Sequence, residues 1–209
     1  CIQIFDVVTS ATATITPSGS TTFCQGDSVV LTANSGSSYL WSTGATTRSI
    51  NVKNPGSFTV KVTFSNGSSA TSAATTVTVN TLPTATISAN RSTTFCQGDS
   101  VILTSSAGNS YLWNNGAITR TITVKNSGSF SVKVTNANNC SATSVATAVS
   151  VNTLPAATIS ANGNTTFCQS DSVTLTSSTG NSYLWNNGAI TRSITVKNSG
   201  SFSVKVTNA

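Results

Sequence analysis

Ser110-Tyr-Leu-Trp-Asn-Asn-Gly116 and Ser127-Gly-Ser-Phe-Ser-Val-Lys-Val-Thr135 are the two stretches that decide the fold. In the second stretch, Phe130, Val132 and Val134 alternate with polar residues, which is the period-two pattern of a strand with one buried face. The first stretch is a short strand that carries a tryptophan and ends in Asn-Asn-Gly, a strong turn signal. Together the two stretches predict antiparallel β-structure.

The same pattern continues on both sides of these stretches. Short alternating segments predict further strands at residues 84–88, 100–104, 120–125 and 144–151. No segment has the spacing of an amphipathic helix. Six or seven short strands, with turn signals about every ten residues, predict an all-β chain of Ig-like antiparallel β-sandwiches.

The whole chain repeats with a period of 72 residues. This spacing separates the members of two series: Cys24, Cys96 and Cys168, and Trp41, Trp113 and Trp185. Residues 84–137 and 156–209 differ at only seven of 54 positions. A repeat of this kind is typical of tandem arrays. It predicts a leading strand at 1–11 that belongs to a preceding or neighbouring module, Ig-like repeats at 12–83 and 84–155, and a third repeat at 156–209 that lacks its last strand.

Short proline-containing segments join the predicted repeats. Asn80-Thr-Leu-Pro83 ends the first repeat and Asn152-Thr-Leu-Pro155 ends the second. Proline fixes φ and removes a hydrogen-bond donor, so a joint this short is expected to be semi-rigid. Modules connected in this way are expected to form a rod or filament.

Three segments of the middle repeat carry a resemblance to a known family. They are residues 93–101 (Thr-Thr-Phe-Cys-Gln-Gly-Asp-Ser-Val), 110–116 and 127–135. They resemble the Ig-like tandem repeats of secreted Bacteroidota proteins, which build large cell-surface adhesins, gliding-motility adhesins among them, and spacers of secreted enzymes. The resemblance covers nearly the whole chain. It implies export by the type IX system and an extracellular or cell-surface location.

The resemblance also implies a disulfide within the middle repeat. In the related repeats, the positions of Cys96 and Cys140 form a clamp. Closing a 45-residue loop would stabilise the repeat by roughly 4 kcal/mol on the chain-entropy model. The alternative is a pair of buried thiols, and an extracellular setting favours the bond.

The other three cysteines have no partner in this scheme. Ser68 occupies the position in the first repeat that matches Cys140, so the partners of Cys1, Cys24 and Cys168 are uncertain or lie outside the chain. Placed after Ala209, Cys1 would nearly restore the sequence around Cys140. The chain is therefore expected to be either a window of a longer covalent array or a subunit that polymerises head to tail. In the second case, residues 1–10 complete the open sheet of the next subunit. A Cys1–Cys24 bond is a third hypothesis.

Composition argues against several function classes. Charged residues make up 7% of the chain, and the only acidic residues are four aspartates. With no histidine and no glutamate, the sequence lacks a carboxylate pair, a triad base and a metal-ligand cluster, so no catalysis, metal or cofactor is expected. The net charge of +6 is dispersed, which argues against nucleic-acid binding and leaves weak attraction to surface polysaccharide as a hypothesis. No apolar run reaches the length of a membrane span.

Three serines are candidate O-glycosylation sites. Ser28, Ser100 and Ser172 each follow an aspartate and precede a valine, which resembles the general O-glycosylation signal of Bacteroidota. The alternative is that the aspartate only caps a turn at the entry to a strand.

The aromatic residues offer a second candidate site. Each predicted third strand carries a tyrosine and a tryptophan on one face, and an exposed pair of this kind stacks on sugar rings. The tyrosines Tyr39, Tyr111 and Tyr183 are the candidates for glycan stacking, while Trp41, Trp113 and Trp185 are expected in the core.

The sequence therefore predicts a non-catalytic structural region of a secreted bacterial cell-surface adhesin or filament, acting as a stalk or shaft. The predicted partners are neighbouring modules or identical subunits. The alternatives are a multivalent carbohydrate-binding array and the spacer of a secreted hydrolase.

Overall fold

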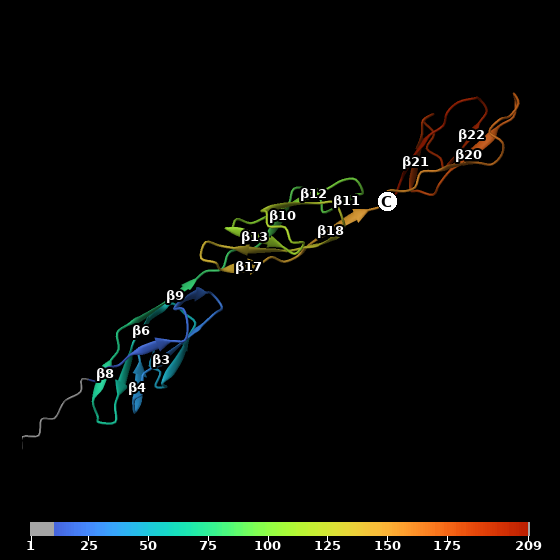
Figure 1. Ribbon diagram of the computed structural model, residues 1–209. Helices are drawn as coiled ribbons and strands as arrows, with labels where there is room; N and C mark the ends of the chain where they lie inside the picture. The colour runs from blue at the N-terminus through green and yellow to red at the C-terminus, as the bar shows by residue number, and fades with distance from the viewer. Residues whose placement is uncertain (1–10, 209) are drawn as a thin grey trace, which may run out of the picture. The chain divides into compact units, whose positions relative to one another are not determined.

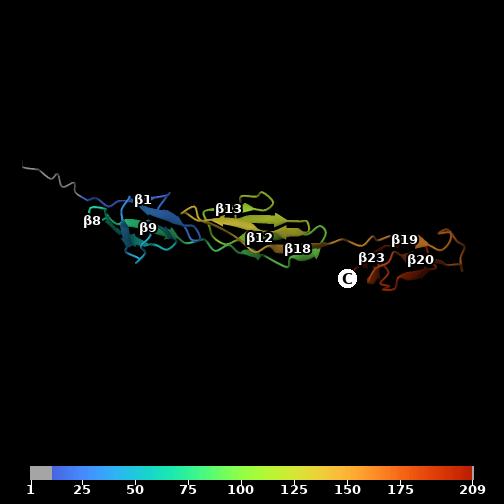
Figure 2. The ribbon, with the colours of Figure 1, turned by 90° about the horizontal axis from the view of Figure 1, so that it is seen from below.

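All regular structure in the described chain is β-structure. The computed structural model describes residues 11–208, and these contain 23 strands and no helix (Figure 1). The prediction of an all-β chain built from Ig-like sandwich sheets is confirmed. The strands are short, between three and six residues, and are joined by turns and loops (Figure 2).

The first repeat contains nine strands: β1 (Ile15–Pro17), β2 (Thr22–Cys24), β3 (Val29–Ala33), β4 (Ser38–Trp41), β5 (Ser49–Val52), β6 (Gly56–Phe58), β7 (Val60–Thr63), β8 (Ser69–Thr71) and β9 (Thr75–Asn80). They form three sheets with the orders β1-β3-β5, β2-β9-β6 and β4-β7-β8. β2 runs parallel to β9, whereas the other pairs are antiparallel.

The middle repeat has the same element order. Its strands are β10 (Ile87–Ala89), β11 (Thr94–Cys96), β12 (Val101–Ser105), β13 (Ser110–Trp113), β14 (Thr121–Val124), β15 (Gly128–Phe130), β16 (Val132–Thr135), β17 (Ser141–Thr143) and β18 (Thr147–Asn152). The sheet orders are β10-β12-β14, β11-β18-β15 and β13-β16-β17.

The chain divides into two compact units, and both draw on the middle repeat. Within the described residues, one comprises 11–88, 104–121 and 131–146, and the other comprises 89–103, 122–130 and 147–208. The predicted repeat boundaries at 83/84 and 155/156 remain predictions.

The alternation of side chains explains the core of the first repeat. In β3, Val29 and Leu31 are buried and the residue between them is exposed. Val60 and Val62 of β7 are fully buried in the same cluster, around Trp41. The indole N–H of Trp41 donates to the carbonyl of Thr47 at 2.8 Å, which satisfies the single polar group of this large buried side chain.

One predicted strand is broken and two strands were not predicted. The segment 129–135 forms β15 and β16, separated at Ser131. The predicted strand 144–151 corresponds to β18, which begins at Thr147, and the unpredicted β17 precedes it. β11 was not predicted because it has only three residues and no alternating sequence pattern. Its extended conformation comes from parallel pairing with β18.

The third repeat has five strands: β19 (Ile159–Ala161), β20 (Val173–Ser177), β21 (Ser182–Trp185), β22 (Ser193–Val196) and β23 (Val204–Thr207). They form the sheets β19-β20-β22 and β21-β23. Residues 166–168 and 200–202, which are equivalent to β11 and β15, are not strands. No described residue supplies a counterpart of β18, the strand with which both of them would pair.

Candidate functional site

A disulfide joins the first repeat to the second. It links Cys24, at the end of β2, to Cys140, in the loop between β16 and β17, with a Cα–Cα distance of 5.5 Å. The expected Cys96–Cys140 bond is therefore wrong, and so is the Cys1–Cys24 hypothesis. Cys96 and Cys168 are exposed free thiols. Cys1 lies outside the described residues.

The parallel pairing of β11 with β18 explains this correction. Cys96 lies opposite Asn152 in the register of these two strands. Asn152 follows Cys140 by twelve residues, most of them in the strands β17 and β18. Extended chain rises about 3.3 Å per residue, whereas a disulfide needs a Cα–Cα separation of about 4.4–6.8 Å. Cys140, in the loop before β17, bonds instead to Cys24 of the preceding repeat.

Hydrogen bonds reinforce the disulfide. The side-chain amide of Asn136 donates to the carbonyl of Thr81 at 2.8 Å. The backbone N–H of Gln25 donates to the carbonyl of Asn80, also at 2.8 Å, and the sulfur of Cys140 lies 4.0 Å from that oxygen. We call Cys24, Asn80, Thr81, Asn136 and Cys140 the joint cluster. It fixes the proline-containing linker at the point where the first repeat ends.

Asn136 also shapes the loop that carries Cys140. Its side-chain oxygen accepts hydrogen bonds from the backbone N–H groups of Asn138 and Cys140, at 3.1 and 3.0 Å. Asn139 follows with φ of 60°, a left-handed conformation that asparagine tolerates. Cys140 itself is fully buried. These hydrogen bonds therefore fix the conformation of the loop that carries Cys140.

Asn136 was not among the predicted site residues, although the sequence carries a signal for it. In the first repeat, the positions of Asn136 and Cys140 hold Phe64 and Ser68, so both joint residues are replaced together. Cys24, by contrast, has counterparts in every repeat. This pattern is expected when the cysteine of one repeat bonds to the loop of the next one.

Hydrogen bonds like those of the joint cluster are also present between the middle and third repeats. Asn208, the counterpart of Asn136, donates to the carbonyl of Thr153 at 2.8 Å. Gln97 donates its backbone N–H to the carbonyl of Asn152, as Gln25 does to Asn80. Cys96 takes the place of Cys24 beside this linker.

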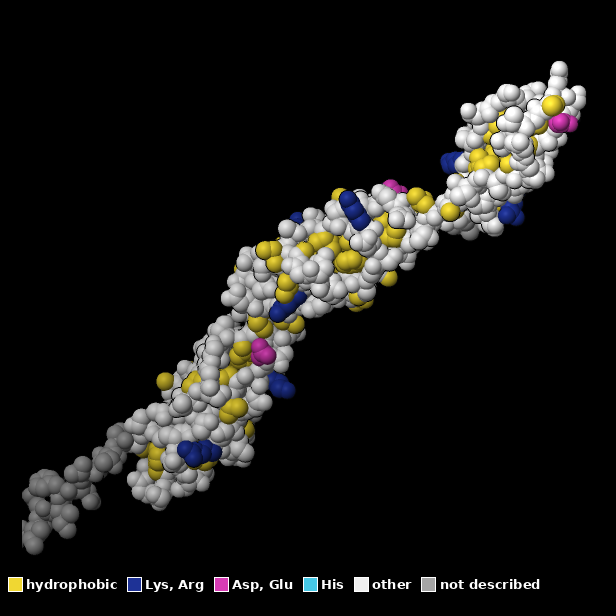
Figure 3. Space-filling view, turned by 45° about the vertical axis from the view of Figure 1, so that its right-hand side comes forward, with side chains coloured by type: hydrophobic (Ala, Val, Ile, Leu, Met, Phe, Trp, Pro, Cys, Tyr) yellow, Lys and Arg dark blue, Asp and Glu magenta, His cyan; other side chains and the backbone are white. Residues whose placement is uncertain are grey.

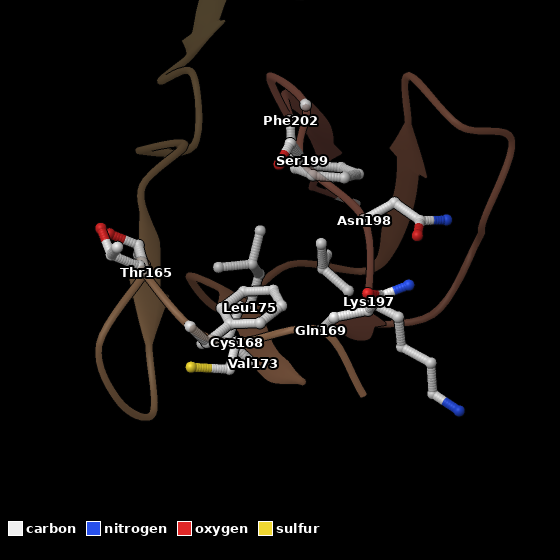
Figure 4. Close-up of a pocket in the computed structure, with 13 residues that line it drawn as sticks. Thr165, Cys168, Gln169, Val173, Leu175, Lys197, Asn198, Ser199 and Phe202 are labelled. Atoms are coloured by element: carbon white, nitrogen blue, oxygen red, sulfur yellow. The ribbon is translucent and has the colours of Figure 1, made fainter. Parts of the chain in front are cut away.

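A cavity of about 610 Å³ opens in the third repeat. Its apolar lining comes from Phe167, Val173, Leu175, Val196 and Phe202. Figure 4 shows Thr165 and Cys168 on one side of it and Asn198, Ser199 and Phe202 on the other, with Leu175 between them. Lys197 is the one charged side chain in this lining.

The tyrosine and tryptophan of each aromatic pair are held by hydrogen bonds to the backbone of their own repeat. Trp113 is 1% exposed, and its indole N–H donates to the carbonyl of Thr119 at 2.8 Å. The hydroxyl of Tyr111 accepts from the N–H of Gly108 and donates to the carbonyl of the same residue, both at 3.0 Å. The equivalent bonds recur in the other repeats, at Tyr39, Trp41, Tyr183 and Trp185.

The candidate glycosylation serines follow a tight turn. In the first repeat, Asp27 donates its backbone N–H to the carbonyl of Cys24 at 3.0 Å, and Gly26 has φ of 104°. Ser28 and Ser172 are exposed, whereas Ser100 is half-buried. Their modification remains a prediction.

Charged side chains are dispersed over the surface. Figure 3 shows lysine, arginine and aspartate side chains scattered over the face in view, with no dense basic patch. The Nε of Arg120 donates to the carbonyl of Ser105 at 3.3 Å, and Arg48 and Arg192 make the equivalent bond, so these cations also support the fold. Within residues 11–208 no three potential metal-ligating side chains come together, and no helix is long and apolar enough to cross a membrane.

No protein-family model matches the sequence, and no curated protein matches it. Solved structures with a similar arrangement include murine CEACAM1b, with a TM-score of 0.34 and 13% identity over 67% of this chain and 100% of that chain. Fibronectin(III)-like modules of Clostridium thermocellum CbhA give a TM-score of 0.36 and 12% identity, over 66% of this chain and 92% of theirs. The amphioxus IgVJ-C2 molecule gives 0.30 and 15%, over 62% and 99%.

Proposed function

We propose that the chain is a non-catalytic structural region of a secreted bacterial cell-surface adhesin or filament, and that its Ig-like modules act as a shaft. The modules are those predicted from the 72-residue period. The resemblance of the repeats to those of Bacteroidota surface proteins supports this setting. The observation that carries the proposal is the disulfide between Cys24 and Cys140, because it ties two successive modules together.

The position of the disulfide is suitable for a protein segment that is under tension. The two cysteines are separated by 116 residues along the chain. A covalent link between them shields most of the first two repeats from extension when the ends are pulled apart. Disulfides persist in oxidising environments, so such a link is typical of secreted and extracellular proteins.

Single-molecule pulling tests this role directly. With handles at both termini, the oxidised chain is expected to extend by about 400 Å less than a chain carrying Cys24→Ser and Cys140→Ser, since each shielded residue spans up to about 3.6 Å. Cys96→Ser is the matched control and should extend like the unchanged protein. Equal extension of the oxidised chain and the double variant would contradict a disulfide that shields the residues between Cys24 and Cys140 from extension.

Glycan binding is the competing function, and the structure offers it less support. The tryptophan of each pair is in the core, and the tyrosine hydroxyl is already bonded as donor and acceptor. A shaft should bind nothing on a glycan array. Binding that is lost in Tyr111→Ala and kept in Tyr111→Phe would instead support the carbohydrate-binding alternative. The third alternative, a spacer of a secreted hydrolase, shares the mechanical role of a shaft.

A further inference from the structure

The outer edge of β5 faces an open groove in the first repeat. β5 is the last strand of the sheet β1-β3-β5, so within residues 11–208 no strand pairs with its outer edge. A groove of about 610 Å³ lies beside it, and its lining includes every residue of β5 together with Ala45, Lys53, Asn54 and Phe58. Because four successive residues of one strand line the groove, the backbone edge of β5 forms one of its walls.

The hydrogen-bond register directs backbone groups of β5 away from β3. The N–H of Ala33 donates to the carbonyl of Arg48, the next pair in this register, at 3.0 Å. Antiparallel bonds join every second pair, so the N–H and C=O groups of Ser49 and Asn51 point outward. The hydroxyl of Thr47 donates to one of these groups, the carbonyl of Ser49, at 2.7 Å. An extended segment beside β5 would meet the remaining groups as hydrogen-bond partners.

The floor of the groove is apolar, and it is more exposed than in the other repeats. Ala45, Ile50 and Phe58 are half-buried. The counterparts of Ile50, which are Ile122 and Ile194, are only 7% and 8% exposed. Every second side chain of an added strand would point toward this floor and cover it.

Donor groups gather where β5 ends. Lys53 and Asn54 also line a second hollow, of about 240 Å³, and Lys53 is the one charged side chain in either lining. Pro55 and Val79 line the second hollow as well. Their counterparts in the middle repeat form a hydrogen bond, in which the N–H of Val151 donates to the hydroxyl of Ser127 at 2.9 Å. Proline has no hydroxyl, so a carboxylate in this hollow would replace the missing acceptor and would face the ammonium of Lys53.

We propose that the first repeat binds an extended acidic segment of another protein, which adds to the outer edge of β5 and places a carboxylate beside Lys53. The backbone of the segment would bond to Ser49 and Asn51, and its inward side chains would cover Ile50. A second copy of this edge is a poorer occupant, because antiparallel pairing would bring Lys53 of one copy near Arg48 of the other. The site goes beyond the shaft role and does not depend on it.

Fluorescence anisotropy with a synthetic peptide tests the proposal. The probe is acetyl-Asp-Asp-Val-Thr-Val-Thr-Val with a dye at its C-terminus, because an antiparallel strand would place its N-terminal carboxylates beside Lys53. It is titrated with the oxidised full chain and is expected to bind at one site. A peptide with asparagine in place of both aspartates should bind more than about tenfold more weakly. Added salt should reduce that difference.

Asn51→Pro separates pairing at the strand edge from attraction between charges. The N–H of Asn51 points away from β3, so proline removes a donor to the peptide and keeps the bonds within the sheet. This variant is expected to bind the peptide more than about tenfold more weakly. Thr123→Pro, the same change in the edge strand β14 of the middle repeat, is the matched control and should bind like the unchanged chain.

Hydrogen exchange gives a readout that depends on no variant. Peptide binding should slow exchange at the amides of Ser49 and Asn51 and leave that of Thr123 unchanged. The proposal is overturned if the acidic peptide does not bind, or if it binds without protecting Ser49 and Asn51. Binding that is lost in Lys53→Gln and kept in Asn51→Pro would also overturn it, because a polyanion held by charge alone, such as an acidic polysaccharide, behaves in that way.

Discussion

Ser105 and Ser177 each bury a hydroxyl that has no hydrogen-bond partner. Each is 2% exposed, and the equivalent residue of the first repeat, Ala33, is equally buried without a polar group. A buried polar group that loses its bonds to water and gains none in return costs free energy. These serines are therefore a cost to the fold that the first repeat avoids.

Replacing either serine by alanine should stabilise its repeat. Ser105→Ala and Ser177→Ala are each expected to raise the free energy of unfolding by about 1 kcal/mol. Ala33→Ser is the reciprocal change and should lower it by a similar amount. Urea denaturation followed by tryptophan fluorescence measures both effects. If Ser105→Ala lowers stability instead, the hydroxyl has a partner after all.

Ser170 carries a backbone strain that its counterparts avoid. Its φ is 85°, and the same turn position holds Gly26 and Gly98, with φ of 104° and 100°. A side chain at positive φ is unfavourable, whereas glycine adopts this conformation freely.

Ser170→Gly should stabilise the third repeat by about 0.5–1 kcal/mol, and Gly98→Ser should destabilise the middle repeat by a comparable amount. The midpoint of urea denaturation reports both changes. Gly163→Ala is a control for a change of glycine at an open site, because a Cβ there would meet nothing within 4 Å and its φ is not positive. A larger loss in Gly163→Ala than in Gly98→Ser would refute the strain argument.

At the scale of single elements, whether a short segment forms a strand depends on the segments that pair with it. The sequence Thr-Phe-Cys occurs at residues 94–96 and again at 166–168, but only the first copy is a strand, β11. The difference is β18, which pairs with β11 and has no counterpart among the described residues of the third repeat. Three residues are too few to hold an extended conformation without a partner.

Hydrogen exchange should report this difference between identical segments. The amides of residues 166–168 are expected to exchange much faster than those of 94–96, and those of residues 200–202 faster than those of 128–130. The reason is that β18 forms backbone hydrogen bonds with residues 94–96 and 128–130, and these bonds slow exchange. Residues 182–185 and 110–113 are the control, since β21 and β13 are both paired and should exchange alike. Equal exchange at 94–96 and 166–168 would show that another segment occupies the position of β18.

At the scale of the whole molecule, the disulfide between Cys24 and Cys140 links two repeats rather than closing a loop within one. On the chain-entropy model, a link between residues 116 apart reduces the entropy of the unfolded chain enough to stabilise the fold by about 5 kcal/mol. The joint cluster adds its hydrogen bonds at the same place. The stability of the first two repeats is therefore coupled through one covalent bond.

Thiol mapping checks this connection in the intact chain. With Cys1→Ser, an alkylating reagent should modify Cys96 and Cys168 under non-reducing conditions, and a digest should yield one linked peptide that contains Cys24 and Cys140. Reduction before alkylation should label all four cysteines. A linked peptide of Cys96 and Cys140 would restore the pairing that the sequence suggested.

The sequence alone was sufficient for the fold class, an all-β chain of Ig-like sandwich sheets. Alternation in segments such as 129–135, the buried tryptophan and the Asn-Asn-Gly turn each act over a few residues, so they predict strands and a sandwich without knowledge of what packs against them. The 72-residue period extends this conclusion along the chain.

Only the tertiary structure decided which cysteines meet. Cys96 and Cys140 share a repeat, but parallel pairing of β11 with β18 places Cys96 opposite Asn152, and Cys24 of the preceding repeat is the partner of Cys140. This connection arises from pairing between segments distant in the chain, and local sequence patterns carry no information about which segments those are.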